Sequence, residues 1–156
     1  MFDRLQRFFD EVSGARAREM GTDDPQVAAA ALLVHVARAD GEERQSEDER
    51  LLASLRSAFG LDPHEAARVA EMGRRADEEA VDLYRFTSVI KAHMDEAERI
   101  AFVDLVWDTI YADGEVHELE DNLAWRIAEL LGVSSRDRMI GKRRAAERSS
   151  AENAES

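Results

Sequence analysis

The sequence predicts an all-α fold, a compact bundle of about seven to eight helices with an internal pseudo-twofold duplication. Three observations carry this prediction: apolar residues recur at three- and four-residue spacing, helix caps divide the chain, and one acidic segment occurs twice. No stretch alternates apolar and polar residues for long enough to indicate a strand. At 156 residues the chain is long enough to bury one core without covalent help.

Capping residues give the expected helix boundaries. Four N-cap patterns are present, two with an acid before a first-turn proline and two with capping-box spacing: Asp24-Pro25, Asp62-Pro63, Ser46 with Glu49, and Ser134 with Asp137. Glycines fall where helices are expected to end: Gly41, Gly60, Gly73, Gly114 and Gly132. The expected helices span roughly residues 2–13, 25–39, 46–59, 63–74, 78–92, 95–112, 118–131 and 134–147, followed by a frayed tail over 149–156.

Apolar residues on one face of these helices predict the core. They follow helical spacing in two groups: Leu32, Leu33, Val36, Leu51, Leu52, Leu55 and Phe59, then Phe102, Leu105, Val106, Ile110, Leu123, Ile127 and Leu130. Trp107 and Trp125 lie on apolar helix faces, so we interpret both as packing residues and not as ligand-stacking residues.

Composition excludes several classes of function. The chain has no cysteine, which excludes disulfides, thiolate zinc sites, iron-sulfur clusters and cysteine nucleophiles. The net charge of −13 disfavours binding to nucleic acid, because a phosphate backbone repels an acidic surface. The first residues lack the uninterrupted apolar core of a signal peptide, and no segment reaches about 18 apolar residues. We therefore expect a soluble, cytoplasmic protein.

The two ends differ from the acidic body. Phe2, Leu5, Phe9 and Val12 lie on one face of the first helix, which could dock on the body, on a partner or on a membrane surface. Residues 136–148 include six basic and two acidic residues, which gives this stretch a net charge of +4. This basic helix could bind anionic lipid or an acidic protein, or neutralise the acidic body of its own chain.

An acidic segment is repeated at an offset of 73 residues. ADGEERQSED (39–48) aligns with ADGEVHELED (112–121) at six positions in ten, and an apolar helix is expected before and after each copy. Two such units tend to pack about a pseudo-twofold axis, which brings equivalent residues close together. Asp40, Glu47, Asp113 and Glu120 then converge on one shared site or line one face as two sites.

The aspartates of this repeat are the strongest candidates for a functional site. Asp40 and Asp113 are expected in the last turn of a helix, where an acid faces the negative end of the helix dipole. A local rule that is broken twice at equivalent positions indicates function. Glu47 and Glu120 are expected in a first turn, where the dipole favours an acid, so a capping role competes with a ligand role. Gly41 and Gly114 are expected to serve the backbone as helix caps.

Carboxylates from a turn and the following helix suit a hard divalent cation such as calcium, magnesium or manganese. Each copy reproduces the final D-G-x5-E of a calcium-binding EF-hand loop, whereas the first half of that loop is absent from both. The histidines His35, His64, His93 and His117 have no zinc-ligand spacing. No nucleophile elbow, phosphate loop or dinucleotide motif is present, so we expect no enzyme activity and no catalytic residues.

The two ADGE turns, each followed by Glu-Asp, and the segment ALLVHVARADG before the first resemble the TerB-like family, over about residues 25–138. Residues 1–24 and 139–156 lie outside this resemblance, as an amphipathic N-terminal helix with its linker and as a basic helix end with a polar tail. The resemblance implies a bundle of seven or more helices, a link to tellurium resistance and stress response, divalent-metal binding through clustered acids, and membrane-associated protein partners. The matching acids are Asp40, Glu47, Asp113 and Glu120.

The sequence thus predicts a non-enzymatic, metal-binding module of the TerB type. The alternative is a metal-free scaffold, in which the acidic face or the amphipathic first helix recruits a protein partner.

Overall fold

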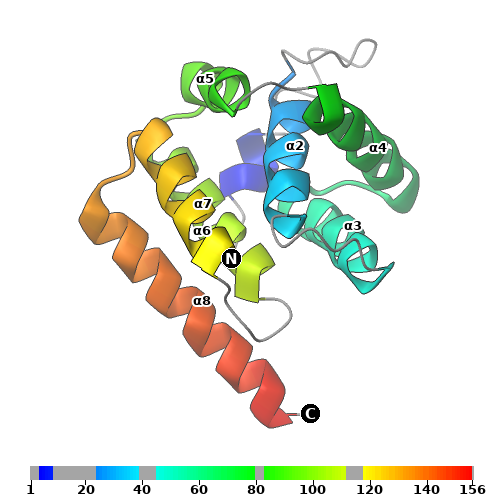
Figure 1. Cartoon of the computed structure of the whole chain (residues 1–156). Helices are drawn as coiled ribbons and strands as arrows, with labels where there is room; N and C mark the ends of the chain where they lie inside the picture. The colour runs from blue at the N-terminus through cyan, green and yellow to red at the C-terminus, as the bar shows by residue number, and fades with distance from the viewer. Residues whose placement is uncertain (1–3, 9–23, 39–44, 80–82, 112–117, 156) are drawn as a thin grey trace.

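The computed structural model describes residues 4–8, 24–38, 45–79, 83–111 and 118–155, and for residues 45–50, 149 and 151–155 it describes the backbone alone. Within these ranges the chain contains no strand, a short helical stretch at residues 4–8 and seven longer helices (Figure 1). The longer helices are α2 (Pro25–Ala37), α3 (Gln45–Phe59), α4 (Pro63–Glu79), α5 (Tyr84–His93), α6 (Glu96–Tyr111), α7 (Glu118–Leu130) and α8 (Ser135–Glu155). The predicted all-α bundle is confirmed.

Helix α2 occupies the centre of the bundle. Residues 25–34 are all buried, and so is Val36, because the helix consists almost entirely of alanine, valine and leucine. A helix that is apolar on every side is stable only when other elements surround it. Accordingly α2 contacts five helices, α3, α4, α5, α6 and α7 (Figure 1).

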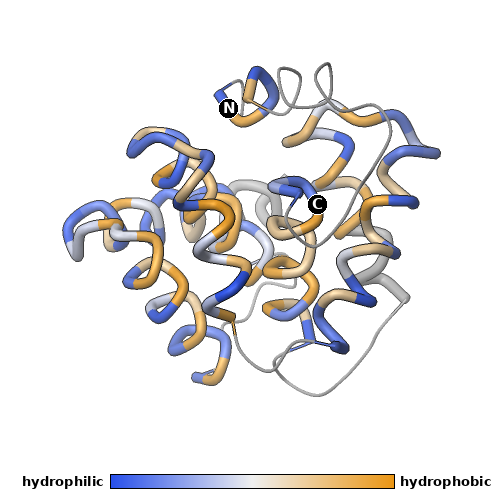
Figure 2. Tube along the Cα trace, turned by 90° about the horizontal axis from the view of Figure 1, so that it is seen from above, coloured by the Kyte–Doolittle hydropathy of each residue, from blue (hydrophilic) through white to orange (hydrophobic). Residues whose placement is uncertain are grey.

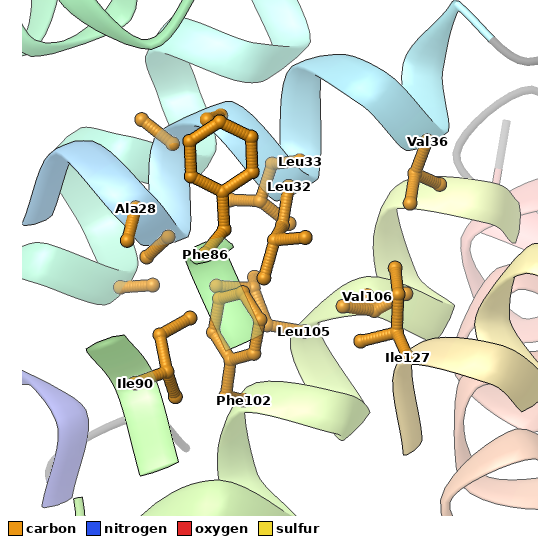
Figure 3. Packing of buried hydrophobic residues seen from close by; sticks show 14 of the residues in the cluster. Ala28, Leu32, Leu33, Val36, Phe86, Ile90, Phe102, Leu105, Val106 and Ile127 are labelled. Carbon is orange, nitrogen blue, oxygen red and sulfur yellow. The ribbon is translucent and has the colours of Figure 1, made fainter. Parts of the chain in front are cut away.

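The core is one cluster of apolar side chains centred on α2. Figure 3 shows Leu32 and Leu33 of α2 together with Phe86 of α5 and Phe102 and Leu105 of α6. Each of these side chains is buried. Most of the predicted core residues lie in this cluster, and Leu52 and Leu123 pack against it while partly buried.

The peripheral helices turn their hydrophobic sides toward the interior and their hydrophilic sides outward (Figure 2). The short stretch at residues 4–8 also joins the core, since Leu5 is 0 % and Phe8 is 7 % exposed. The side-chain amide of Gln6 donates a hydrogen bond to the carbonyl oxygen of Ser57 at the end of α3. Of the three roles open to the first helix, docking on the body is therefore the one that its described part adopts. Phe2, Phe9 and Val12 lie outside the described residues.

None of the helices described in these ranges is both long enough and apolar enough to cross a membrane.

Local capping chemistry positions most helix starts as predicted. Asp24 accepts a hydrogen bond from the backbone N–H of Gln26 at 2.8 Å, and Asp62 accepts one from Glu65 at 2.8 Å. These bonds satisfy N–H groups that have no partner inside the helix. The hydroxyl of Ser134 accepts a hydrogen bond from the backbone N–H of Asp137 at 3.2 Å.

Two further helix boundaries have a clear local cause. The start of α6 carries a complete capping box that the helical pattern of the sequence did not predict. The side chain of Asp95 accepts a hydrogen bond from the N–H of Glu98, and the side chain of Glu98 accepts one from the N–H of Asp95, both at 2.8 Å. Gly60 and Gly132 adopt φ of 69° and 74° after α3 and α7, which confirms their predicted role as left-handed caps. Gly41 and Gly114 lie outside the described residues.

The predicted helix end at Gly73 is wrong. Helix α4 continues to Glu79, and Gly73 is buried inside it against α2. A Cβ atom at Gly73 would lie 2.8 Å from the Cβ of Ala30 and 2.9 Å from its carbonyl carbon. The glycine is therefore explained by the close approach of two helices and not by a change of backbone direction.

Other boundaries also differ from the expectation. Helix α5 begins at Tyr84, six residues later than expected, and α3 begins at Gln45, so Ser46 lies inside its first turn. The expected frayed tail is wrong for the backbone of residues 149–155, because α8 remains helical to Glu155.

The contact of Gly73 with α2 leads to a stability prediction. Gly73→Val should lower the free energy of unfolding by about 1–3 kcal/mol, because added methyl groups would press on the backbone of α2, which cannot move aside within a packed core. The matched control is Ala67→Val at an exposed position of the same helix. Urea unfolding followed by circular dichroism measures both variants, and equal stability of the two would contradict the proposed helix contact.

Candidate functional site

The structure describes the side chain of one of the four predicted metal ligands. Asp40 and Asp113 lie outside the described residues, and Glu47 lies on α3 where the backbone alone is described. Glu120 lies in the first turn of α7, where it is buried at 7 % exposure. The convergence of the four carboxylates on one site or two therefore stays a prediction.

Glu47 and Glu120 lie on two different helices of the bundle. Glu47 belongs to α3 and Glu120 to α7, and they are 73 positions apart, the offset that relates the two acidic segments in the sequence. The helices flanking the two segments also contact one another, through the pairs α2–α3, α6–α7, α2–α6 and α3–α6. The two acidic segments are attached to neighbouring helices of one body.

Burial distinguishes Glu120 from the other acids of its turn. Glu118 is exposed and Asp121 is half-buried, although both share the first turn of α7 with Glu120. An acid in a helix first turn is stabilised by the dipole by about 0.3–1 kcal/mol, and this contribution does not require burial. A carboxylate removed from water needs in addition a hydrogen-bonding, cationic or metal partner.

The described residues alone do not form a metal site. Over these ranges no group of three or more histidine, aspartate and glutamate side chains is close enough to hold an ion. Any site at Glu120 would have to include carboxylates from the acidic segments around Asp40 and Asp113.

Two of the three described histidines make structural contacts. His35 Nδ1 lies 2.7 Å from Asp77 Oδ1 and so links α2 to α4, and His93 Nδ1 lies 2.8 Å from the carbonyl oxygen of Val89 in its own helix. His64 is exposed, and His117 lies outside the described residues.

A second charged site lies between α8 and the helices α6 and α7. Arg148 Nη2 lies 2.5 Å from Asp108 Oδ1, and Lys142 Nζ lies 2.6 Å from Asp121 Oδ1. A longer pair joins Arg144 to Asp104 at 3.7 Å. The basic segment of α8 therefore neutralises acids of its own chain, which is one of the roles left open for it. The sequence analysis did not identify Asp104, Asp108 or Asp121 as its partners.

The rings of two tryptophans contact basic side chains of α8. The guanidinium carbon of Arg138 lies 4.1 Å from the ring centroid of Trp125, and Lys142 Nζ lies 5.3 Å from that of Trp107. Both are cation–π contacts. Trp107 is fully buried and Trp125 is partly buried, which confirms their interpretation as packing residues. Gly141 permits the close approach of α8, because a side chain there would collide with the carboxylate of Asp104.

The interface leaves some polar groups poorly satisfied. Trp107 Nε1 and Arg138 Nε are buried without a hydrogen-bond partner.

Burial also raises the pKa of Asp104 above its ordinary value. The charges of Arg144 and Arg148 oppose this rise, whereas those of Asp108 and Asp137 add to it. Ion pairs that are partly exposed contribute only about 0.2–1 kcal/mol each. The α6–α8 contact is therefore held by modest charge interactions over an incompletely paired polar surface.

The raised pKa of Asp104 leads to a pH prediction. A carboxyl group that binds its proton more tightly in the folded state contributes stability that is fully present below its unfolded pKa of about 3.9 and is lost as the pH rises through the folded pKa. Asp104→Asn keeps a neutral group at every pH, so this variant should lose less stability than the parent chain between pH 4 and 7. Urea unfolding of both proteins across this pH range measures the loss of stability. Equal losses in the variant and the parent chain would contradict the raised pKa of Asp104.

Taken together, the fold and its charges define the class of this protein: an acidic all-α bundle around one apolar helix, with a repeated acidic segment carried by neighbouring helices. A model of the family described as tellurite resistance protein TerB matches residues 26–142, from the start of α2 into α8. This span covers about three quarters of the chain, and the chain belongs to the TerB family. Comparison with curated proteins and with solved structures gives no significant match.

Proposed function

We propose that this chain is a non-enzymatic, cytoplasmic TerB-type module that binds a divalent metal ion through its two acidic segments and acts in a stress response linked to tellurium resistance. Asp40, Glu47, Asp113 and Glu120 are the proposed ligands. Membership of the TerB family supports the general assignment.

The observation that carries the proposal is the burial of Glu120 in the first turn of α7. A solvated, dipole-stabilising acid would be exposed, as Glu118 is. A buried carboxylate at a position equivalent to Glu47, on a helix that follows a second copy of the same acidic turn, is what a ligand-holding segment requires.

The chemistry of the proposed ligands restricts the ion. All four side chains supply carboxylate oxygens, and no cysteine is present to favour a soft metal. Calcium, magnesium and manganese accept such ligands, with water or backbone carbonyls completing the coordination sphere. Ion binding would tie the start of α7, and by equivalence the start of α3, to the turn before each helix.

Metal binding predicts a rise in thermal stability. In a panel of calcium, magnesium and manganese, at least one ion should raise the Tm, because a ligand that binds only the folded state stabilises it. Asp40→Asn combined with Asp113→Asn should abolish the rise, and Glu120→Gln should reduce it. Differential scanning calorimetry with and without a chelator makes the measurement.

The matched control is Glu118→Gln, which removes one carboxylate from the same turn of α7 at an exposed position. It should keep the metal-dependent rise. A Tm that responds to no ion in the panel would refute the proposal.

The alternative is a metal-free scaffold whose acidic face binds a basic, membrane-associated protein partner. The net charge of −13 favours it, because a strongly acidic surface attracts basic partners over a long range at low salt. The version in which the first helix recruits a partner is weakened by the burial of Leu5 and Phe8 in the chain's own core.

The scaffold alternative makes a different prediction for the same double variant. Asp40→Asn with Asp113→Asn should leave the Tm insensitive to metal, as the parent chain would already be, and should weaken pull-down of a basic partner at low salt. Partner binding that survives the loss of these charges would count against the acidic-face version.

A further inference from the structure

Helix α8 is attached to the bundle differently from the other helices. Among its described side chains, Ala145 is the one apolar group that is fully buried, and Met139 is 47 % exposed. By contrast, α5 buries Phe86 and Ile90, and α2 and α6 each bury several large apolar side chains. The contacts of α8 with the bundle are instead ion pairs, cation–π contacts and the packing of Gly141 against the fully buried Trp107.

The surface beneath α8 has a defined pattern, which we call the docking face: Asp104, Trp107 and Asp108 of α6 with Asp121 and Trp125 of α7. Asp104 and Asp108 are one helical turn apart, and their partners Arg144 and Arg148 are one turn apart on α8. Lys142 reaches across to Asp121 on α7. Helix α8 thus meets the docking face with cations at this spacing and with Gly141, where a side chain would collide with the carboxylate of Asp104.

We propose that α8 is an intramolecular ligand of this docking face, and that the face accepts a basic helical segment of a protein partner when α8 is released. This proposal is independent of metal binding, because none of the five residues of the docking face is a proposed metal ligand.

Three observations favour release of α8 as a unit. The connection from α7 to α8 is short and contains Gly132 at φ 74°, a position where the chain changes direction. The far end of α8 extends past the rest of the bundle (Figure 1). The ion pairs of α8 retain side-chain exposures from 16 % to 58 %, so solvent and salt reach them.

The incomplete pairing of the interface favours exchange of α8 for another helix. Trp107 Nε1 and Arg138 Nε are buried without partners while α8 is in place. A partner helix with an acceptor near Trp107 would satisfy a group that α8 leaves unpaired, and so could compete with it. The charge pattern of the docking face selects a basic helix over an acidic or an apolar one.

Tryptophan fluorescence reports on the docking face directly, because the two tryptophans of the chain both lie beneath α8. In the full chain, Arg144→Glu with Arg148→Glu should raise the acrylamide quenching constant severalfold while the circular dichroism of the remaining helices persists. The matched control, Arg136→Glu with Arg143→Glu, makes the same change of charge at two exposed positions of α8 and should quench like the parent chain.

Two outcomes of this experiment would overturn the proposal. One is unchanged quenching in the Arg144/Arg148 variant. The other is loss of helical signal across the whole chain, which would show that α8 is required for the core. A salt series on the parent chain, which carries no substitution, gives an independent test: quenching should rise between about 0.1 and 1 M salt, as the Debye length falls from about 10 to 3 Å. A flat salt response overturns the proposal equally.

Binding of a second helix is tested with a fluorescently labelled peptide of residues 135–155. The Arg144/Arg148 variant keeps its docking face intact, so it should bind the peptide at least tenfold more tightly than the parent chain, whose own α8 competes. A peptide carrying Arg144→Glu and Arg148→Glu should not bind. Absence of binding to the opened variant, or equal affinity for the variant and the parent chain, would overturn the proposal.

Discussion

The burial of α2 on every side is the constraint on which the rest of the structure depends. A helix composed almost entirely of alanine, valine and leucine has no polar face, so it is stable only when other helices surround it, here α3 to α7. Its small side chains permit close contact, closest where Gly73 of α4 packs on Ala30. Helices α2 and α6, which precede the two acidic segments in the sequence, both pack in this core.

The sequence predicts well those features that depend on neighbouring residues. Caps at Asp24, Asp62 and Ser134 are found where expected, since a cap satisfies backbone groups within one turn. Gly60 and Gly132 end helices, but Gly73 does not, although all three look alike in the sequence. The difference is tertiary: Gly73 is required by the approach of a helix more than thirty residues away, which no local pattern can reveal.

The candidate sites likewise contain some features that the sequence predicts and others that depend on tertiary packing. An internal repeat is a property of the sequence, so it singles out Asp40, Glu47, Asp113 and Glu120 as candidates before any coordinates. The pairing of α8 with Asp104 and Asp108 depends on the register between two packed helices, and sequence shows only the charge imbalance of residues 136–148. That imbalance was a usable signal, because a cationic helix in a chain of net charge −13 has acids of its own chain within reach.

The span of the family match divides α8 in two. The match ends at Lys142, so Gly141 and Lys142 belong to the part shared with the TerB family, whereas Arg144 and Arg148 lie beyond it. Changes in the latter two positions would alter how firmly the helix is held without touching the family pattern that builds the core. The attachment of α8 and the packing of the core around α2 thus depend on different residues of the chain.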